Sequence, residues 1–237
     1  TVANNTIPHN WHKLLVKQKM GYMVGKPITF SDKEARETEE GTVESPNENF
    51  INKINKLLGD KWDDTANELV KGAANKGVEW LHIYIEKDGR FGYTVIDARQ
   101  IIPIWRSSKE EKLQAVIRYY KVQVDDEYRI KAEYWTENTV TYFLENDNGK
   151  FKIDKVTVSQ PKQAHFNKVK QAGEKVLSKK ASGWGMVPFI PFKNNEEMLS
   201  DLNNYKELID EYDKNRSDMA NLLEDIQDVV YVLENYD

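Results

Sequence analysis

Histidines and carboxylates are the side chains with which this 237-residue chain could do metal or acid–base chemistry. The zinc spacings HxxxH and HExxH do not occur: His9 and His12 are three residues apart, and the other two histidines stand alone. Nothing marks Asp97, Glu133 or Glu137 as a catalytic carboxylate pair. The absence of cysteine excludes thiol nucleophiles, disulfides and cysteine-bound metals. We therefore predict no enzyme activity, no metal and no cofactor.

A stretch at residues 21–28, GYMVGKPI, superficially resembles a phosphate-binding loop. That loop needs four residues between its glycines and a Ser or Thr after the lysine. Here three residues separate the glycines, while Pro27 replaces the hydroxyl and removes an N–H donor. The sequence also contains no G-x-S-x-G nucleophile elbow. A helix end followed by a strand explains the stretch better.

The composition bounds the class of protein. The chain has 39% hydrophobic residues, 31% charged residues and a net charge of -5. No apolar run approaches the roughly 20 residues of a membrane span, and the first residues do not form a signal peptide. The negative charge argues against a protein that coats nucleic acid non-specifically. We expect a soluble protein with one large domain, or one domain and an extension.

The elements that must position any functional side chain begin with helices. Asn5 or Thr6 can cap an amphipathic helix that ends near Gly25. The segments that follow are predicted to be a short strand at 26–30, an acidic surface loop at 31–49, and helices at 46–58 and 62–76.

From residue 78 the hydrophobic period changes to two, which predicts strands. An Asp88-Gly89 turn joins the first two as a hairpin. The predicted strands lie in VEWLHIYIE, FGYTVID, LQAVIRYYKVQV, YRIKAEYWTE, TVTYFLE and KFKIDKV. Short polar turns between them indicate an antiparallel meander, so the fold class is α+β.

Residues 155–182 carry seven lysines against one acid, Glu174. Two interpretations are open. The segment is either a solvated, flexible connection or a surface that binds a polyanion or an acidic partner. The basic patch on the second interpretation contains Lys168, Lys170, Lys175, Lys179 and Lys180.

The last part of the chain predicts a long helix. MVPFIPF ends a strand near Lys193, and Asn194 is a candidate N-cap with Glu197 in a capping-box position. We expect a helix over residues 194–228. Steps of four and three give a narrow heptad seam suited to another helix, with Arg216 pairing an acid across it and setting the register. The seam is Met198, Leu202, Tyr205, Ile209, Tyr212, Arg216, Met219, Leu223 and Ile226, locally widened by Leu199, Leu208 and Leu222.

The remaining faces of this helix are acidic, with eleven acids between residues 196 and 228. Either the helix caps the sheet, or it lies outside the globular part and has its own partner; no other predicted helix is as long. The acidic surface is assigned to Asp201, Glu207, Asp210, Glu211, Asp213 and Asp218.

Several stretches together resemble the portal proteins of tailed double-stranded-DNA bacteriophages, in the branch typical of long-tailed phages of Gram-positive bacteria. The resemblance rests on NNTIPHNWHKLLVKQKMGYMVGKPITF, LVKGAANKGVEWLHIYIEKDG, IIPIW, AVIRYYK and the run from GMVPFIPFKNNEEMLSDL to the end. It implies a ring, usually of twelve copies, at one capsid vertex, through which DNA is packaged and ejected. The implied partners are double-stranded DNA, terminase, scaffolding, capsid and head–tail connector proteins, without a membrane.

The resemblance also implies a domain organisation. Residues 1–193 correspond to the portal wing, 194–228 to the first stem helix and 229–237 to the start of the clip. The rest of the clip, the second stem helix, the tunnel loop and the crown are expected to be missing from this chain. The implied location is the capsid portal vertex, reached from the host cytoplasm during assembly. The alternative function is a non-enzymatic phage adaptor or scaffold-binding module that acts through the long helix.

Overall fold

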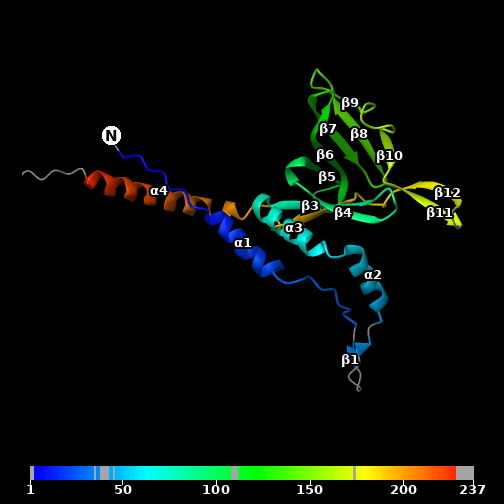
Figure 1. Cartoon of the computed structure of the whole chain (residues 1–237), viewed down its shortest axis with the longest axis horizontal. Helices are drawn as coiled ribbons and strands as arrows, with labels where there is room; N and C mark the ends of the chain where they lie inside the picture. The colour runs from blue at the N-terminus through cyan, green and yellow to red at the C-terminus, as the bar shows by residue number, and fades with distance from the viewer. Residues whose placement is uncertain are drawn as a thin grey trace, which may run out of the picture.

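The computed structural model of the chain describes residues 3–34, 36–37, 43–44, 46–107, 112–172 and 175–227. It has a β-rich part at one end and a long helix that projects from it (Figure 1). No helix in these ranges combines the length and apolar character that a membrane crossing requires. The α-helices are α1 (Trp11–Val24), α2 (Glu48–Leu58), α3 (Trp62–Lys76) and α4 (Leu202–Gln227).

Two antiparallel sheets form the β-rich part, which we call the sheet region. One has the order β13-β3-β4, and the other has the order β10-β8-β7-β6-β5 with β9 paired to β8. A hairpin, β11–β12, extends beyond the sheets (Figure 1). Their strands are β3 (Val78–Ile85), β4 (Phe91–Ile96), β5 (Ile101–Trp105), β6 (Leu113–Val124), β7 (Glu127–Trp135), β8 (Thr139–Glu145), β9 (Phe151–Ile153), β10 (Lys162–Ala164), β11 (Phe166–Ala172), β12 (Lys175–Ser182) and β13 (Phe189–Lys193).

The core lies between these two sheets. Trp80, Val116 and Phe189 are at most 2% exposed and belong to one cluster fed by both sheets. His82 of β3 is buried beside them, with its ring stacked 4.4 Å from that of Phe189. Its Nδ1–H donates to the Pro188 carbonyl at 2.9 Å. Burial lowers the pKa of His82 from 6.5 to about 4, so the ring is neutral at pH 7.

The α+β class and most sheet elements match the prediction. Residues 78–96 form the expected hairpin, and β6, β7, β8 and β9 pair in sequence as a meander. Strand β5 is not among the predicted strands, and it has Pro103 in its middle. The proline is tolerated there because β5 is an edge strand, in which one row of backbone groups needs no strand partner.

The interpretation of residues 155–182 as a flexible connection is wrong for most of the segment. Strand β10 joins the edge of the larger sheet, and β11 and β12 pair with each other over their length. Lys168 stands directly opposite Lys180 in this pairing, and both are exposed. The side chains of the other three predicted patch members, Lys170, Lys175 and Lys179, lie outside the described residues.

The N-terminal third differs from the prediction in three places. Helix α1 begins at Trp11 and not at Asn5 or Thr6, because residues 3–10 run extended along α4. It is not clearly amphipathic either: Val16 alone among its described residues is buried. Residues 26–30 form no strand; Ile28 N–H bonds the Asp63 carboxylate instead of a neighbouring strand. The predicted acidic loop contains two short paired strands, β1 (Arg36–Glu37) and β2 (Val43–Glu44), and its other central residues lie outside the described ranges.

Candidate functional site

Two of the three carboxylates considered for chemistry, Glu133 and Asp97, are occupied by structural contacts. Glu133 is buried, and its two oxygens accept hydrogen bonds from the Tyr120 hydroxyl at 2.7 Å and the Trp135 indole at 2.9 Å. Asp97 pairs with Lys76 and with Arg99, and hydrogen bonds from Arg99 hold its pKa well below the usual range. Within the described ranges, no three His, Asp or Glu side chains are grouped to hold a metal ion. The functional candidate is therefore α4 and its attachments.

Helix α4 is joined to the sheet region through residues 194–201, which we call the junction segment. Two backbone bonds seat it on the end of α3: Asn194 N–H to Gly77 O and Asp201 N–H to Ala74 O, both 2.9 Å. Gly77 has φ +89°, and a Cβ there would lie 1.8 Å from the Met198 carbonyl oxygen. A glycine is required at this position by both the backbone angle and the close approach.

The long helix starts eight residues later than predicted, at Leu202. The expected cap at Asn194 does not form, because its side-chain amide donates to Leu199 O and to Asp201 Oδ1. Met198 has φ +55°, which is incompatible with a right-handed helix. Met198 therefore does not belong to the helical seam. The junction segment contains a turn in which Met198 N–H donates to Asn195 O at 3.2 Å, and α4 begins only after it.

Lys19 of α1 clamps the junction segment. Its ammonium group donates to Asn194 Oδ1 at 2.7 Å and to Asp201 Oδ2 at 2.9 Å. Burial alone would raise the pKa of Asp201, but hydrogen bonds from Asn194 and Lys19 outweigh it and the pKa is lowered. Asp201 is thus an attachment residue, and its assignment to a free acidic helix surface is wrong.

Residues 3–10, the N-terminal segment, run antiparallel along α4 (Figure 1). Every second backbone N–H of this segment donates to a side chain of α4, and each acceptor lies four residues closer to the start of α4 than the one before. Two extended residues advance about 6.6 Å and four helical residues about 6.0 Å, so the two periods nearly match. The bonds are Ala3 to Asp225 at 3.5 Å, Asn5 to Asn221 at 2.6 Å, Ile7 to Ser217 at 3.0 Å and His9 to Asp213 at 3.1 Å.

At the start of α4, the contact with the N-terminal part of the chain is made by the Tyr205 ring and the His12 imidazole. The Tyr205 hydroxyl lies 2.8 Å from His12 Nδ1, and His12 Nε2 lies 2.8 Å from Asn75 Oδ1 on α3. Because the Asn75 amide nitrogen already donates to Lys71 O, its oxygen faces the imidazole and Nε2–H is the donor. Helix α4 is therefore tied to α3 through His12. The resulting covered face of α4, whose residues are half-buried, is Leu202, Tyr205, Ile209, Asp213, Ser217, Ala220 and Asn221.

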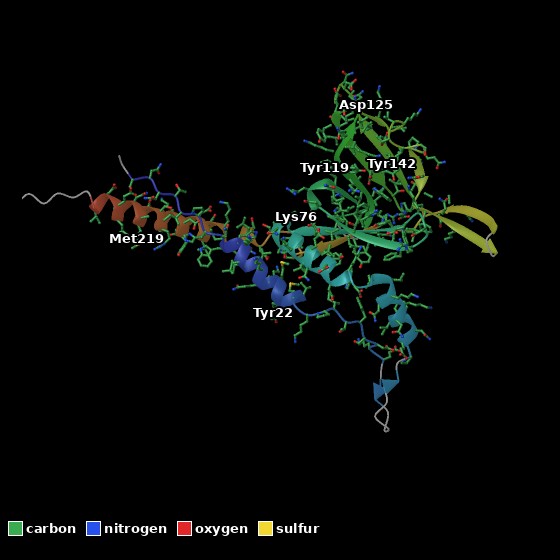
Figure 2. All side chains as sticks on the ribbon, in the orientation of Figure 1. Tyr22, Lys76, Tyr119, Asp125, Tyr142 and Met219 are labelled. Atoms are coloured by element: carbon green, nitrogen blue, oxygen red, sulfur yellow. The ribbon has the colours of Figure 1, made fainter. Side chains whose placement is uncertain are left out.

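A second face of α4 is apolar and exposed, and we call it the open face. Except for Leu223, its positions belong to the series with steps of four and three that starts at Leu208 and also includes Asn215, so they form one longitudinal seam. Met219 lies on this face and is labelled in Figure 2. The open face consists of Leu208, Tyr212, Met219, Leu222, Leu223 and Ile226, with exposed fractions of 68%, 42%, 52%, 62%, 54% and 62%.

The predicted seam is thus divided between two faces. Leu202, Tyr205 and Ile209 are half-buried, whereas Met219, Leu223 and Ile226 are exposed. Tyr212 is 42% exposed, although its ring also contacts His9 and Trp11. The sequence analysis places Leu208 and Leu222 beside the predicted seam, although both belong to the exposed apolar face. A second heptad series that starts at Leu208 in the sequence would have identified them. Arg216 is exposed, and its pairing with an acid of another helix remains a prediction.

The acidic surface forms a third face. Glu207, Glu211 and Asp218 are exposed and share one row with Lys214, at steps of four, three and four. Asp210 is exposed and paired with Lys206. Asp213 is not part of this surface, because it lies on the covered face and bonds His9 Nδ1 at 2.7 Å. We call Glu207, Glu211 and Asp218 the acidic row.

A family profile described as "Phage portal protein, SPP1 Gp6-like" matches residues 1–237. The chain therefore belongs to this family of phage portal proteins, which confirms the resemblance. The portal protein of Bacillus phage SPP1 is 37% identical over 238 residues, covering 100% of this chain and 43% of the relative. That of Clostridium phage phiCD119 is 32% identical over 256 residues, covering 99% of this chain and 48% of the relative. The chain spans less than half the length of these curated relatives.

Proposed function

We propose that this chain is the wing and first stem helix of a structural portal subunit, copies of which form a ring at a capsid vertex for the passage of double-stranded DNA. Residues 1–193 would be the wing, the junction segment would connect it to the stem, and α4 (Leu202–Gln227) would be the stem helix; residues 228–237, which include the proposed clip residues 229–237, lie outside the described ranges. The observation that carries the proposal is the division of α4 into a covered, an open and an acidic face. One face is held by the chain itself, one is available for a neighbouring helix, and one can line a channel.

The acidic row gives the proposal its physical basis. Carboxylates along a channel repel phosphates, whereas lysines or arginines would bind them with release of counterions at each contact. DNA would therefore slide past α4 without adhering. No group in the described ranges suggests a nucleotide site, so the energy for packaging would come from a separate terminase. Scaffolding, capsid and connector proteins would be the other partners.

Assembly is tested through the open face in the phage-encoded protein. Leu222→Asp places a carboxylate in the seam and is expected to abolish ring particles in negative-stain images and in sedimentation. Asn203→Asp adds the same charge at an exposed polar position of α4 and should leave rings intact. Leu202 and Ile209 are unsuitable, because they are covered within the chain. Unchanged rings in Leu222→Asp would contradict the proposal.

DNA passage is tested separately through the acidic row. The triple variant Glu207→Lys, Glu211→Lys, Asp218→Lys should still form rings, since the open face is untouched. We expect procapsids that carry it to package less nuclease-protected DNA. Packaging at the normal rate would instead favour the alternative, an adaptor in which no DNA passes along α4.

A further inference from the structure

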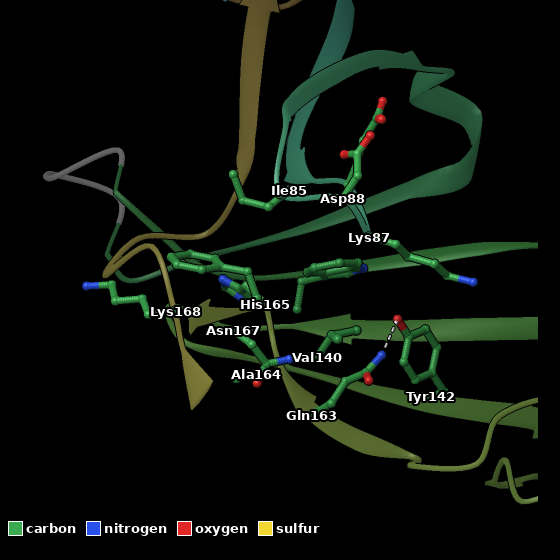
Figure 3. A pocket seen from close by; sticks show the side chains of 14 residues that line it. Ile85, Lys87, Asp88, Val140, Tyr142, Gln163, Ala164, His165, Asn167 and Lys168 are labelled. Atoms are coloured by element: carbon green, nitrogen blue, oxygen red, sulfur yellow. Dashed lines mark hydrogen bonds between the residues drawn. The ribbon is translucent and has the colours of Figure 1, made fainter. Parts of the chain in front are cut away.

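The sheet region has a groove, but little apolar surface is accessible in it. The groove, of about 810 Å³, lies between the turn of the β3–β4 hairpin and strands β10 and β11 (Figure 3). Trp135 and Val140 beneath it are only 9% and 2% exposed, and the Tyr142 hydroxyl accepts a hydrogen bond from the Gln163 amide at 3.2 Å. Accessible apolar surface lies instead on the other face of the larger sheet and on α2.

The other face of the larger sheet is apolar, and we call it the outer sheet face. Val116 is paired with Trp135, and both belong to the core cluster between the sheets. Because side chains alternate along a strand, the neighbouring pair of Ile117 and Tyr134 projects to the opposite side. The outer sheet face consists of two rows that follow the strand pairing, Ile102, Ile117 and Tyr134 in one and Tyr119, Phe143 and Ile153 in the other.

This face is open to solvent. Ile102, Tyr119 and Ile153 are 49%, 38% and 54% exposed, and the other three members are half-buried. A contiguous exposed patch of large apolar side chains on a sheet marks a surface that binds another protein element.

Helix α2 is also apolar on one side. Its apolar residues are Phe50, Ile51, Ile54, Leu57 and Leu58, which lie along that side. None of them is buried against the described part of the chain, and Phe50 and Leu57 are 64% and 54% exposed. A helix of 11 residues is marginal in water by itself. We therefore expect the apolar side of α2 to be covered in the assembled protein.

Helix α2 and the outer sheet face lie on opposite sides of the sheet region. Glu79 of β3 points toward α3, where its carboxylate lies against Gly72, and the next residue, Trp80, points into the core between the sheets. The layers therefore follow in the order α3, smaller sheet, larger sheet and outer sheet face. Helix α2 is attached on the α3 side, where the Leu58 carbonyl accepts a hydrogen bond from the Tyr93 hydroxyl of β4 (Figure 1).

This placement suits head-to-tail contact between copies of the chain. A ring needs two different, complementary patches on every subunit. In a ring of many copies, each subunit is turned by only a small angle from the next, so the two patches lie on nearly opposite sides. Helix α2 is about 16 Å long, and the strands from β5 to β9 span about 19 Å, so the outer sheet face has room for one such helix.

We propose that α2 of one subunit packs its apolar side on the outer sheet face of the next subunit. The inference rests on the ring proposed above, and it adds a second contact between neighbours outside α4. The contact is heterologous: every subunit gives its helix to one neighbour and its sheet to the other. It covers both apolar surfaces at once, which neither surface achieves within one chain.

The test is cross-linking of assembled rings of the phage-encoded protein with a short bismaleimide. Leu57→Cys on α2 and Tyr119→Cys on the outer sheet face, combined in one chain, should give a ladder of covalent products longer than dimers, because each subunit is joined on both sides. Each single variant should give no product beyond that of the unmodified protein. The control pair combines Tyr119→Cys with Asn52→Cys, which lies about 160° around α2 from Ile54, and it should lose most of the ladder.

An added charge tests the same contact without cross-linking. Phe50→Asp should raise the protein concentration at which half of the subunits are in rings roughly tenfold or more, as measured by sedimentation velocity. Asn52→Asp adds the same charge on the polar side of α2 and should leave that concentration unchanged. Both sites are exposed, and circular dichroism establishes that the fold is retained.

Three outcomes would overturn the proposal. They are normal rings that give no ladder from the double cysteine variant, cross-linked dimers from Leu57→Cys alone, which would mean that α2 packs on α2, and equal effects of Phe50→Asp and Asn52→Asp. All three are results for a protein that still forms rings, so they leave the proposed function intact. Absence of rings in the unmodified protein would instead contradict the proposed function itself.

Discussion

The sheet region and α4 are held in place by different physics. Trp80, Val116 and Phe189 are almost fully buried between two sheets, so their contribution comes from removing apolar surface from water. Along α4, by contrast, the contacts beyond Tyr205 include hydrogen bonds from an extended segment to polar side chains at the surface, together with edge-on contacts of the Tyr212 ring with His9 and Trp11. Such bonds each add only about 0.5–1.5 kcal/mol. We therefore expect the stability of the sheet region to depend mainly on buried apolar surface, and the position of α4 to depend more on surface contacts.

The largest expected contrast comes from truncating an apolar side chain in each region. Phe189→Ala, at a site only 2% exposed, should lower the free energy of unfolding by about 3–5 kcal/mol. Leu222→Ala, at a site 62% exposed, should change it by less than about 0.5 kcal/mol in the isolated chain. Urea unfolding followed by tryptophan fluorescence measures both. Similar losses in the two variants would remove the distinction between the regions.

Acid should weaken the sheet region through His82. Its pKa falls from 6.5 to about 4 on folding, so between these values the unfolded chain binds more protons. This contribution to stability is complete above about pH 6.5 and is lost as the pH falls toward 4. We expect His82 to account for about 2 kcal/mol of destabilisation between pH 7 and pH 4.5. Urea unfolding at several pH values should show a flatter dependence in His82→Gln, and the same slope in both proteins would contradict this role.

A substitution of Gly77 should lower the free energy of unfolding by less than Phe189→Ala does. Gly77→Ala combines a left-handed backbone with a clash against the Met198 carbonyl, and should cost more than the 1–2 kcal/mol of the backbone alone. Gly89→Ala is the matched control, since its φ of +88° is nearly the same and nothing lies within 4 Å of its Cβ position. Hydrogen exchange should accelerate in residues 194–205 only in Gly77→Ala. Equal behaviour of the two variants would argue against a tight junction.

The smallest effect on stability is expected at the N-terminal segment. The double variant Ser217→Ala, Asn221→Ala removes the acceptors of the Ile7 and Asn5 amides and should cost under about 1 kcal/mol globally. Hydrogen exchange of those two amides should nevertheless accelerate roughly tenfold, which corresponds to the loss of about one hydrogen bond. Asn203→Ala is the control on the same helix. Unchanged amide exchange would mean that these side chains do not hold the segment.

Local sequence signals predicted an element correctly where the residues that form and end it lie within a few positions of one another. Helix α3 runs over the predicted residues because Gly77 can take the left-handed angle that ends a helix. The β3–β4 hairpin follows from alternation and an Asp-Gly turn, both of which act over a few residues. The family resemblance, too, was contained in the sequence alone and is confirmed by the matching profile.

Only the tertiary structure decided where α1 and α4 begin and which face of α4 is open. Residues 3–9 are extended because their amides find acceptors more than 200 positions away in the chain. Residues 194–201 stay non-helical because they bond to α3 and Lys19. The heptad pattern showed that α4 has an apolar seam, but covering by the N-terminal segment selected the face that stays exposed. Periodicity records which residues are apolar, whereas the neighbours that bury them are set by long-range packing.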